Sequence, residues 1–206
     1  LAGILIPVVM RAKVKTRVAN SKYQMVELAN AIKTYKIDHS RWPVPKGYPK
    51  NSFGDKRFGW THNGIYYDNS TVMKILMDEP LPNQTSDLNT KGSYINPKES
   101  EDPELEGFPG LSKSRRYHDL FGNDYKVSFD FNGDGLCADL FYGRPVITKT
   151  ASIGLVDRRK VKNNVGPEVY VLKGEVMIWS FGPDKEYSDS QNAVDGKNSD
   201  NILSWR

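Results

Sequence analysis

One stretch of this chain predicts a helix that is longer than a small domain is wide. No glycine or proline occurs from Val8 to Ser40, and apolar residues recur there at helical spacing: Val14, Val18, Met25, Ala29, Ile32 and Tyr35. The pattern ends before Trp42-Pro43, so we expect a helix of about thirty residues that ends near His39. Such a helix is about 45 Å long, and one of its ends must therefore protrude from the rest of the fold.

The residues that open the chain are apolar on every side of this helix. Leu1 to Met10 carry no charge, and Arg11 follows directly. The run covers roughly 15 Å, about half of a bilayer core, and it lacks the basic start of a signal peptide. A buried helix start is one interpretation, but the abrupt change to an amphipathic pattern favours a segment that packs in lipid or on copies of itself. We expect Pro7 to kink or locally melt the helix.

Positive charge is concentrated on the same helix. The chain has 29 Lys and Arg against 25 Asp and Glu, a net charge of +4. One acid, Glu27, stands among seven cations between residues 11 and 36: Arg11, Lys13, Lys15, Arg17, Lys22, Lys33 and Lys36. DNA binding by this helix is one interpretation, but regular spacing is more typical of solvated or inter-subunit positions, so we expect no nucleic-acid partner. The acidic run from Glu99 to Glu106 is a possible partner on the next subunit.

Turn residues and aromatics dominate the chain after this helix. Residues 41–64 read as an aromatic loop packed by its own side chains, and residues 83–110 as a second irregular stretch. A short helix is expected over Val72–Met77. Strands are expected over Tyr125–Phe129, and over Glu168–Lys173 and Glu175–Phe181 with a tight connection at Gly174.

This order of elements predicts an α+β fold. A long N-terminal helix packs on a C-terminal antiparallel sheet, with long loops between the strands. We divide the chain into a helical stem, residues 1–40 (apolar over 1–10, amphipathic over 11–40), and a globular head, residues 41–206. With one cysteine, Cys137, no disulfide within the chain can stabilise the head.

Both ends of the chain carry motifs that occur together in one family. The opening reads LAGILIP, the long helix ends before an aromatic-Pro pair, and the closing runs are Trp179–Asp184 and Ser199–Trp205. Together they resemble type IV pilin-like proteins, most closely the major pseudopilin of bacterial type II secretion systems and related prepilin-type proteins. The segment Asp119–Tyr125 is similar to that family's D-P-W-G-x-x-Y motif, with Leu120 and Phe121 in place of its Pro and Trp.

The resemblance implies a structural subunit rather than an enzyme. Such subunits enter the bacterial inner membrane, are clipped by a prepilin peptidase and stack helix on helix into a filament in the periplasm or at the cell surface. The partners implied are further copies of the chain, minor pilins and the assembly machinery. The family's methylated first Phe and early Glu are missing here, so we expect about fifteen preceding residues. The residues expected to make the assembly contact are Leu1, Ile4, Leu5, Ile6, Pro7, Val8 and Val9.

An acidic loop near the C-terminus is a candidate calcium site. Ca²⁺ takes six to eight oxygen ligands, and this turn-rich loop offers carboxylates, amides and carbonyls. Its candidate ligands are Asp184, Asp189, Asp195, Asp200 and Asn201. The resemblance points to Asp184, Asp200 and Asn201 among these, because relatives hold Ca²⁺ between the Asp of G-P-D and the acidic residues before the final Trp. A solvated loop is the alternative.

The segment Asp130–Gly135 is a second candidate calcium site. It fits the first half of an EF-hand loop, with Asp130, Asn132 and Asp134 at alternate positions and a following glycine that turns the chain. Position twelve of an EF-hand loop is a bidentate Glu ligand, and here it is Phe141, although Asp139 could partly substitute for that Glu. A polar turn is equally consistent with this sequence.

Catalytic motifs do not occur in the sequence. His39, His62 and His118 lie far apart, and there is no G-x-S-x-G, no P-loop and no G-x-G-x-x-G. We therefore expect no enzymatic activity, and we expect Cys137 to be a small packed side chain.

A binding module is the alternative function. In it, calcium would support an extracellular head whose aromatic loop contacts a sugar or a polymer. The side chains concerned are Trp42, Tyr48, Phe53, Phe58 and Trp60. The competing explanation is that these rings pack as a small core under the loop.

Overall fold

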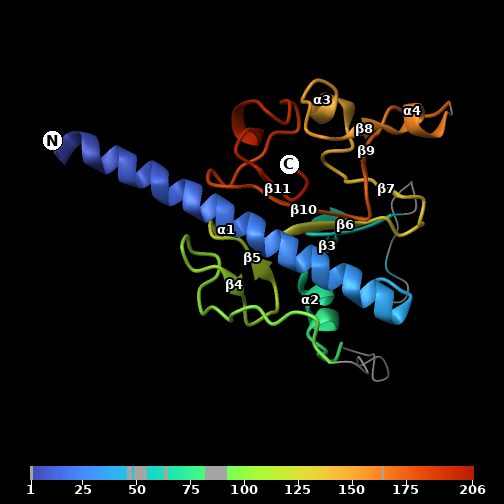
Figure 1. Ribbon diagram of the computed structural model, residues 1–206, viewed down its shortest axis with the longest axis horizontal. Coiled ribbons are helices and arrows are strands. Elements are labelled where there is room, and N and C mark those ends of the chain that lie inside the picture. The colour runs from blue at the N-terminus through green and yellow to red at the C-terminus, as the bar shows by residue number, and fades with distance from the viewer. Residues whose placement is uncertain (1, 46–47, 49–54, 63–64, 82–91, 164) are drawn as a thin grey trace.

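The chain folds as a mixed α+β structure, seen in a computed structural model (Figure 1). The structure describes residues 2–45, 48, 55–62, 65–81, 92–163 and 165–206, and the side chains of residues 2–5 and of His62 lie outside the description. As the sequence predicts, one long N-terminal helix is followed by antiparallel strands. Phe53 also lies outside the described residues.

Helix α1 spans Ala2–His39 and ends where the sequence predicts. Ser40, with a φ of 53°, turns the chain out of the helix. The expected local melting at Pro7 is wrong, because Pro7 lies inside α1 and Figure 1 draws one unbroken helix. The missing N–H removes a single bond, to the carbonyl of Gly3, and the helix continues on both sides of Pro7.

One face of α1 packs on the main sheet. Met25, Leu28, Ile32 and Tyr35 follow helical spacing and are at most 1 % exposed. The sheet has the strand order β1-β6-β10-β11, all antiparallel, with β1 at Lys56–Phe58, β6 at Lys126–Phe129, β10 at Val176–Ser180 and β11 at Ile202–Leu203. The amphipathic part of α1 therefore covers one face of a sheet, as its pattern predicts.

The central strand β6 is buried on both faces. Val127 and Phe129 face the core under α1, whereas Lys126 and Ser128 are also at most 5 % exposed. A second apolar cluster, which contains Cys137, Phe141 and Trp179, accounts for this, and Ser128 donates a hydrogen bond to Asp139 beside it. Burial of two polar residues in a central strand is a tertiary effect that the alternating sequence does not reveal. Cys137 is a free and buried side chain, as expected.

The two late strands belong to different sheets. Strand β9 (Tyr170–Lys173) lies between β7 (Leu136–Cys137) and β8 (Val156–Asp157), whereas β10 pairs with β6 and β11. The tight connection expected at Gly174 is confirmed, because Gly174 and Glu175 alone separate the two strands, but the strands do not pair with each other. Each strand pairs with strands that are distant in the sequence, and the residues around Gly174 do not specify that pairing.

The aromatic loop contributes to the head's core rather than to a core of its own. Within it, β1 joins the main sheet, and β2 (Trp60–His62) pairs with β3 (Ile65–Tyr67). Trp42 and Phe58 are buried, and the Trp42 ring stacks on Phe129 with centroids 5.3 Å apart. The expectation of a loop packed by its own side chains is therefore corrected, since these rings pack in the core of the head. The sequence did not show this because strands of three residues are too short to have a visible period.

The remaining elements are short. Helix α2 spans Ser70–Leu76, which agrees with the helix expected there, and α3 and α4 span Pro145–Thr148 and Arg158–Lys162. Strands β4 (Gly110–Leu111) and β5 (Tyr117–His118) pair with each other, and the 3-10 helix η1 covers Gly196–Asn198.

Candidate functional site

The first third of α1 protrudes from the head with its apolar surface uncovered. Every described side chain from residue 6 to residue 16 is exposed, and Figure 1 shows this part of the helix extending past all other elements. Ile6 is 62 % and Val9 is 57 % exposed, and Val8 and Met10 are similar. Pro7 is exposed as well, whereas the side chains of Leu1, Ile4 and Leu5 lie outside the description.

No helix among the described residues combines the length and the apolar character needed to cross a bilayer.

The segment Asp119–Tyr125 anchors α1 to the head. The Tyr125 hydroxyl donates to Gln24 Oε1 at 2.7 Å, deep in the interface. The backbone N–H of Leu120 donates to the Ser21 hydroxyl at 3.3 Å. The helix is therefore fixed at residues 21–24, just after its exposed part ends.

The motif segments in the middle and at the end of the chain lie in contact. Asn123 Nδ2 donates to the carbonyl of Gly182 at 2.9 Å and to Asp119 Oδ2 at 3.1 Å. Gly182 has a φ of +74°, and a Cβ there would overlap the carbonyl of Asp200. Glycine at this position lets the G-P-D turn rest directly on the backbone before the last strand.

That contact creates a site with unsatisfied oxygen atoms. The backbone N–H of Asp184 donates to Asp200 Oδ2 at 3.0 Å. Among the described residues, no donor reaches Asp200 Oδ1 or Asn201 Oδ1, although both atoms are buried. Burial raises the pKa of Asp200, and the negative charge of Asp184 raises it further. Two neighbouring carboxylates and a free amide oxygen are a donor set that fits a hard cation.

The other two candidate ligands of this loop have different contacts. Asp189 forms an ion pair with Arg144 at 2.5 Å, and Asp195 is an exposed residue that precedes η1. In the part of the chain that the structure describes, no group of three or more His, Cys, Asp or Glu is arranged to hold a metal. A cation at Asp184 and Asp200 would therefore also need amide and backbone oxygens.

The second candidate loop adopts the polar turn that its sequence also allowed. Asp130 accepts three backbone N–H groups, from Gly133, Asp134 and Gly135, at 2.8 to 3.1 Å. Asp134 pairs with Arg158 at 3.0 Å. In this arrangement protein donors satisfy the loop's carboxylates, as in a polar turn.

The two remaining candidate ligands of the second site also accept hydrogen bonds from protein donors. Asn132 Oδ1 accepts from the Asp134 N–H at 2.8 Å. Asp139 accepts from the N–H groups of Phe141 and Tyr142 and from Ser128 and Trp179, and it is only 4 % exposed. Asp139 thus supports the core behind β6.

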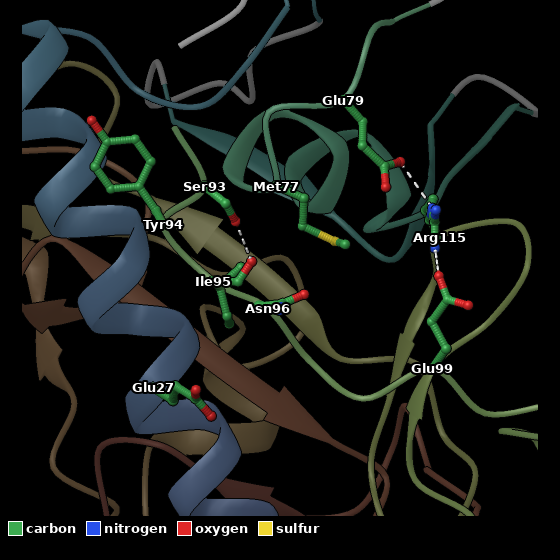
Figure 2. Close-up of a pocket in the computed structure, with 9 residues that line it drawn as sticks. All are labelled: Glu27, Met77, Glu79, Ser93, Tyr94, Ile95, Asn96, Glu99 and Arg115. Atoms are coloured by element: carbon green, nitrogen blue, oxygen red, sulfur yellow. Dashed lines mark hydrogen bonds and ion pairs between the residues drawn. The ribbon is translucent and has the colours of Figure 1, made fainter. Parts of the chain in front are cut away.

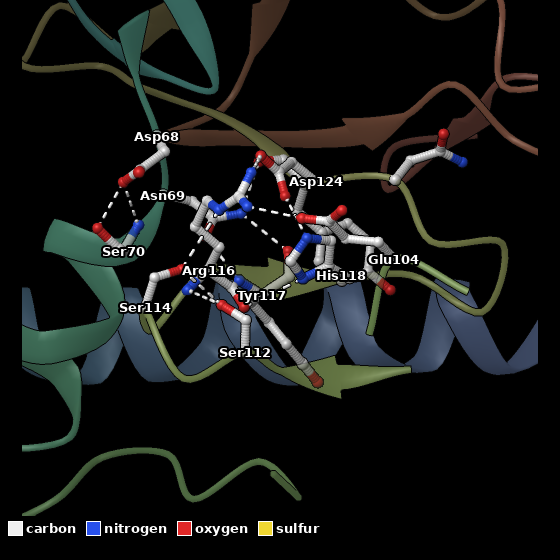
Figure 3. A network of polar contacts seen from close by, with 12 residues as sticks. Asp68, Asn69, Ser70, Glu104, Ser112, Ser114, Arg116, Tyr117, His118 and Asp124 are labelled. Atoms are coloured by element: carbon white, nitrogen blue, oxygen red, sulfur yellow. Dashed lines mark hydrogen bonds and ion pairs between the residues drawn. The ribbon is translucent and has the colours of Figure 1, made fainter. Parts of the chain in front are cut away.

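A polar network, which no motif in the sequence predicts, fixes the strands around β5 (Figure 3). His118 Nε2 lies 2.7 Å from Asp124 Oδ1, and the Tyr66 hydroxyl donates to Asp124 Oδ2 at 2.9 Å. Arg116 reaches Asp124 and Glu104. Burial by itself would raise the pKa of Asp124, but the hydrogen bond and charge of His118, with Lys126, outweigh burial and lower the pKa to about 2.

A polar groove of about 570 Å³ lies between α1, the segment that follows α2 and residues 93–99 (Figure 2). Arg115 connects Glu79, at 2.8 Å, with Glu99 on one side of the groove. Glu27 faces the groove from α1 on the other side, and Figure 2 shows it apart from that ion-pair chain. The groove thus carries a negative charge beside the stem.

The acidic run has partners within the same chain. Glu106 pairs with Arg17 of α1, Glu104 with Arg116 and Glu99 with Arg115. The folded chain thus already pairs these charges, and a contact of Arg17 and this run with the next subunit stays a prediction. Lys13 and Lys15 remain exposed and form no ion pair with any described residue.

Comparisons with protein-family models, with curated proteins and with solved structures found no match to this chain.

Proposed function

We propose that this chain is a structural subunit of a pilin-like filament that assembles through its N-terminal helix. The observation that carries the proposal is the exposed apolar surface of α1 from Ile6 to Met10 on a helix whose later part is anchored in the head. Exposed apolar surface costs free energy in water, and parallel packing against identical helices removes it. The motifs at both chain ends support the same function, because they resemble type IV pilin-like proteins and above all the type II secretion pseudopilins.

The proposal includes partners and a place in the cell. The stem, residues 1–40, packs against stems of further copies, and the head, residues 41–206, faces outward. Before assembly the subunit resides in the bacterial inner membrane, and afterwards it is exposed to the periplasm or the cell surface. Minor pilins and the assembly machinery are its other partners, and it has no catalytic role.

Substitution of Val9 tests the assembly surface. We expect Val9→Asp to abolish self-association, because it places a charge in the apolar contact, while the melting temperature stays unchanged. The matched control is Val165→Asp, since Val165 is a fully exposed valine on the head. Sedimentation velocity and negative-stain microscopy of the 206-residue chain measure the outcome. A Val9→Asp chain that forms the same fibres as the wild type would overturn the proposal.

We further propose that Ca²⁺ bound by Asp184, Asp200 and Asn201 stabilises the head. The unsatisfied buried oxygens of Asp200 and Asn201 support this assignment. An ion that binds only the folded state adds about 2.7 kcal/mol at a hundred times its dissociation constant.

Calcium dependence of the melting temperature tests the site. We expect a chelator to lower the melting temperature of the wild type and added Ca²⁺ to restore it, because the ion binds the folded head only. Asp200→Ala should abolish this response, and Asp134→Asn in the other candidate loop should retain it. A wild type that ignores the chelator contradicts calcium binding, and loss of the response in Asp134→Asn alone would move the site to the other loop.

A further inference from the structure

An aromatic cavity on the head is not used by either proposal above. It has a volume of about 280 Å³ and lies between β2, the segment before α3 and the segment after β10. Its lining residues are Trp60, Leu140, Phe141, Arg144, Tyr187 and Asp189. Trp60 comes from the aromatic loop of residues 41–64, whereas Trp42 and Phe58 of that loop are buried in the core.

Three aromatic rings form the wall of this cavity. The Trp60 ring centroid lies 6.3 Å from those of Phe141 and Tyr187, and Phe141 lies 5.7 Å from Tyr187. Phe141 is buried, whereas Tyr187 is 41 % exposed. The rings come from three separate segments, so the folded chain presents a fixed apolar platform that remains open to solvent.

Polar groups lie at the mouth of the same cavity. Arg144 donates to Asp189 at 2.5 Å, while its guanidinium carbon lies 5.0 Å from the centre of the Phe141 ring. Trp60 Nε1 is itself buried, so Trp60 contributes its ring rather than its N–H to the cavity. The cavity therefore offers aromatic faces beside a fork of donors and an exposed carboxylate.

These groups select the chemistry of the ligand. An anion would be repelled by Asp189 and a cation by Arg144, and a purely apolar ligand would cover both charged groups without offering them a hydrogen bond. A neutral ring with several hydroxyl groups meets all three conditions, because hydroxyls both donate and accept and the C–H face of the ring packs on aromatic faces. We propose that this cavity binds one pyranose ring of a saccharide. The volume lies just below the range of about 300–1,000 Å³ of drug-sized sites, which suits a single ring.

Saccharide binding at this cavity is independent of filament assembly. A ligand with so few atoms in an open cavity binds weakly, and we expect a dissociation constant on the order of 1 to 10 mM. In a filament, many outward-facing heads would present such sites together, and avidity would raise the overall affinity.

The indole N–H signal of Trp60 provides a direct test. Trp60→Phe assigns this signal among those of the four tryptophans, and the ¹⁵N-labelled 206-residue chain is titrated with D-glucose, D-galactose, D-mannose and N-acetyl-D-glucosamine to roughly 50 mM. We expect a saturable shift of the Trp60 N–H with at least one of the four sugars. No shift with any of them would overturn the proposal.

Matched variants locate the effect. Tyr187→Ala and Arg144→Gln should each weaken binding at least tenfold, because one loses a wall of the cavity and the other a donor at its mouth. Tyr23→Ala removes a tyrosine on α1 that is more exposed, 71 % against 41 % for Tyr187, and should leave binding unchanged. Backbone amide spectra of each variant show whether the head is still folded. Unchanged binding by folded Tyr187→Ala and Arg144→Gln chains, or an equal shift with phenylalanine amide as the probe, would overturn the saccharide assignment.

Discussion

Asp55 and Asp124 are buried carboxylates whose surroundings move their pKa values in opposite directions. Burial raises the pKa of Asp55 to about 6, against two hydrogen bonds from the backbone N–H groups of Ala138 and Phe131. The His118 contact lowers the pKa of Asp124 to about 2 despite its burial. Asp124 therefore stabilises the fold above its unfolded pKa, and this contribution is lost as the pH falls from about 4 to 2. Asp55 acts in the other direction, because its ionisation between about pH 4 and 6 lowers the stability of the fold.

Asp124→Asn tests this contribution. At pH 7 we expect the variant to lose about 2 kcal/mol of unfolding free energy, because the pKa shift of Asp124 corresponds to that amount. The difference should shrink as the pH falls to 2, where the wild-type carboxylate is itself becoming protonated. Urea unfolding at pH 7, 4 and 2 measures both effects. Asp195→Asn, at an exposed site, should match the wild type throughout, and a loss in Asp124→Asn that persists undiminished at pH 2 would argue against a charge effect.

At the scale of elements, α1 is one helix with two environments. Its first third is exposed on all sides, and from Ser21 onward one face is buried against β10 and β11. The period of apolar residues predicts the buried face from sequence, because a stripe at spacing three and four lies on one side of a helix. The strand partners were less predictable, because short strands obtain their register from distant segments.

Two isoleucines on α1 allow the effect of burial on the free energy of unfolding to be measured apart from the effect of helix propensity. Ile32 is fully buried and Ile37 is 78 % exposed, and an alanine at either position is a better helix former. We expect Ile32→Ala to lower the unfolding free energy by about 2 to 5 kcal/mol, since it leaves a cavity against the sheet. Ile37→Ala should change it by less than about 0.5 kcal/mol. Equal effects in urea unfolding would mean that α1 does not pack on the sheet as described.

At the scale of the whole molecule, some cations of α1 form ion pairs with the head, and others lie exposed on the protruding part of the helix. Arg17 is held by Glu106, and Lys36 pairs with Glu175 at 2.7 Å, so both ends of the packed part of α1 are tied to the head. Lys13 and Lys15 lie beyond these contacts on the protruding part of the helix. Contacts between subunits would use these two cations.

Charge reversal distinguishes the two roles. Lys13→Glu with Lys15→Glu should leave the unfolding free energy within about 0.5 kcal/mol of the wild type but weaken self-association measured by sedimentation. Arg17→Glu should lower stability by up to about 1 kcal/mol, because it places two like charges together at an exposed site. Glu106→Arg in the same chain should restore that loss. Normal assembly of the Lys13 and Lys15 double variant would contradict a role for these cations between subunits.

The sequence by itself determined the helix, its end near His39, the exposed apolar start and the α+β class. These features depend on local periodicity and on turn residues, which act between neighbours in the chain. Only the tertiary structure decided that Trp42 and Phe58 belong to the core, that β9 and β10 enter different sheets, and that Asp200 and Asn201 bury unpaired oxygens. Those outcomes depend on contacts between residues far apart in sequence, whose pairing is set by the packing of the whole chain.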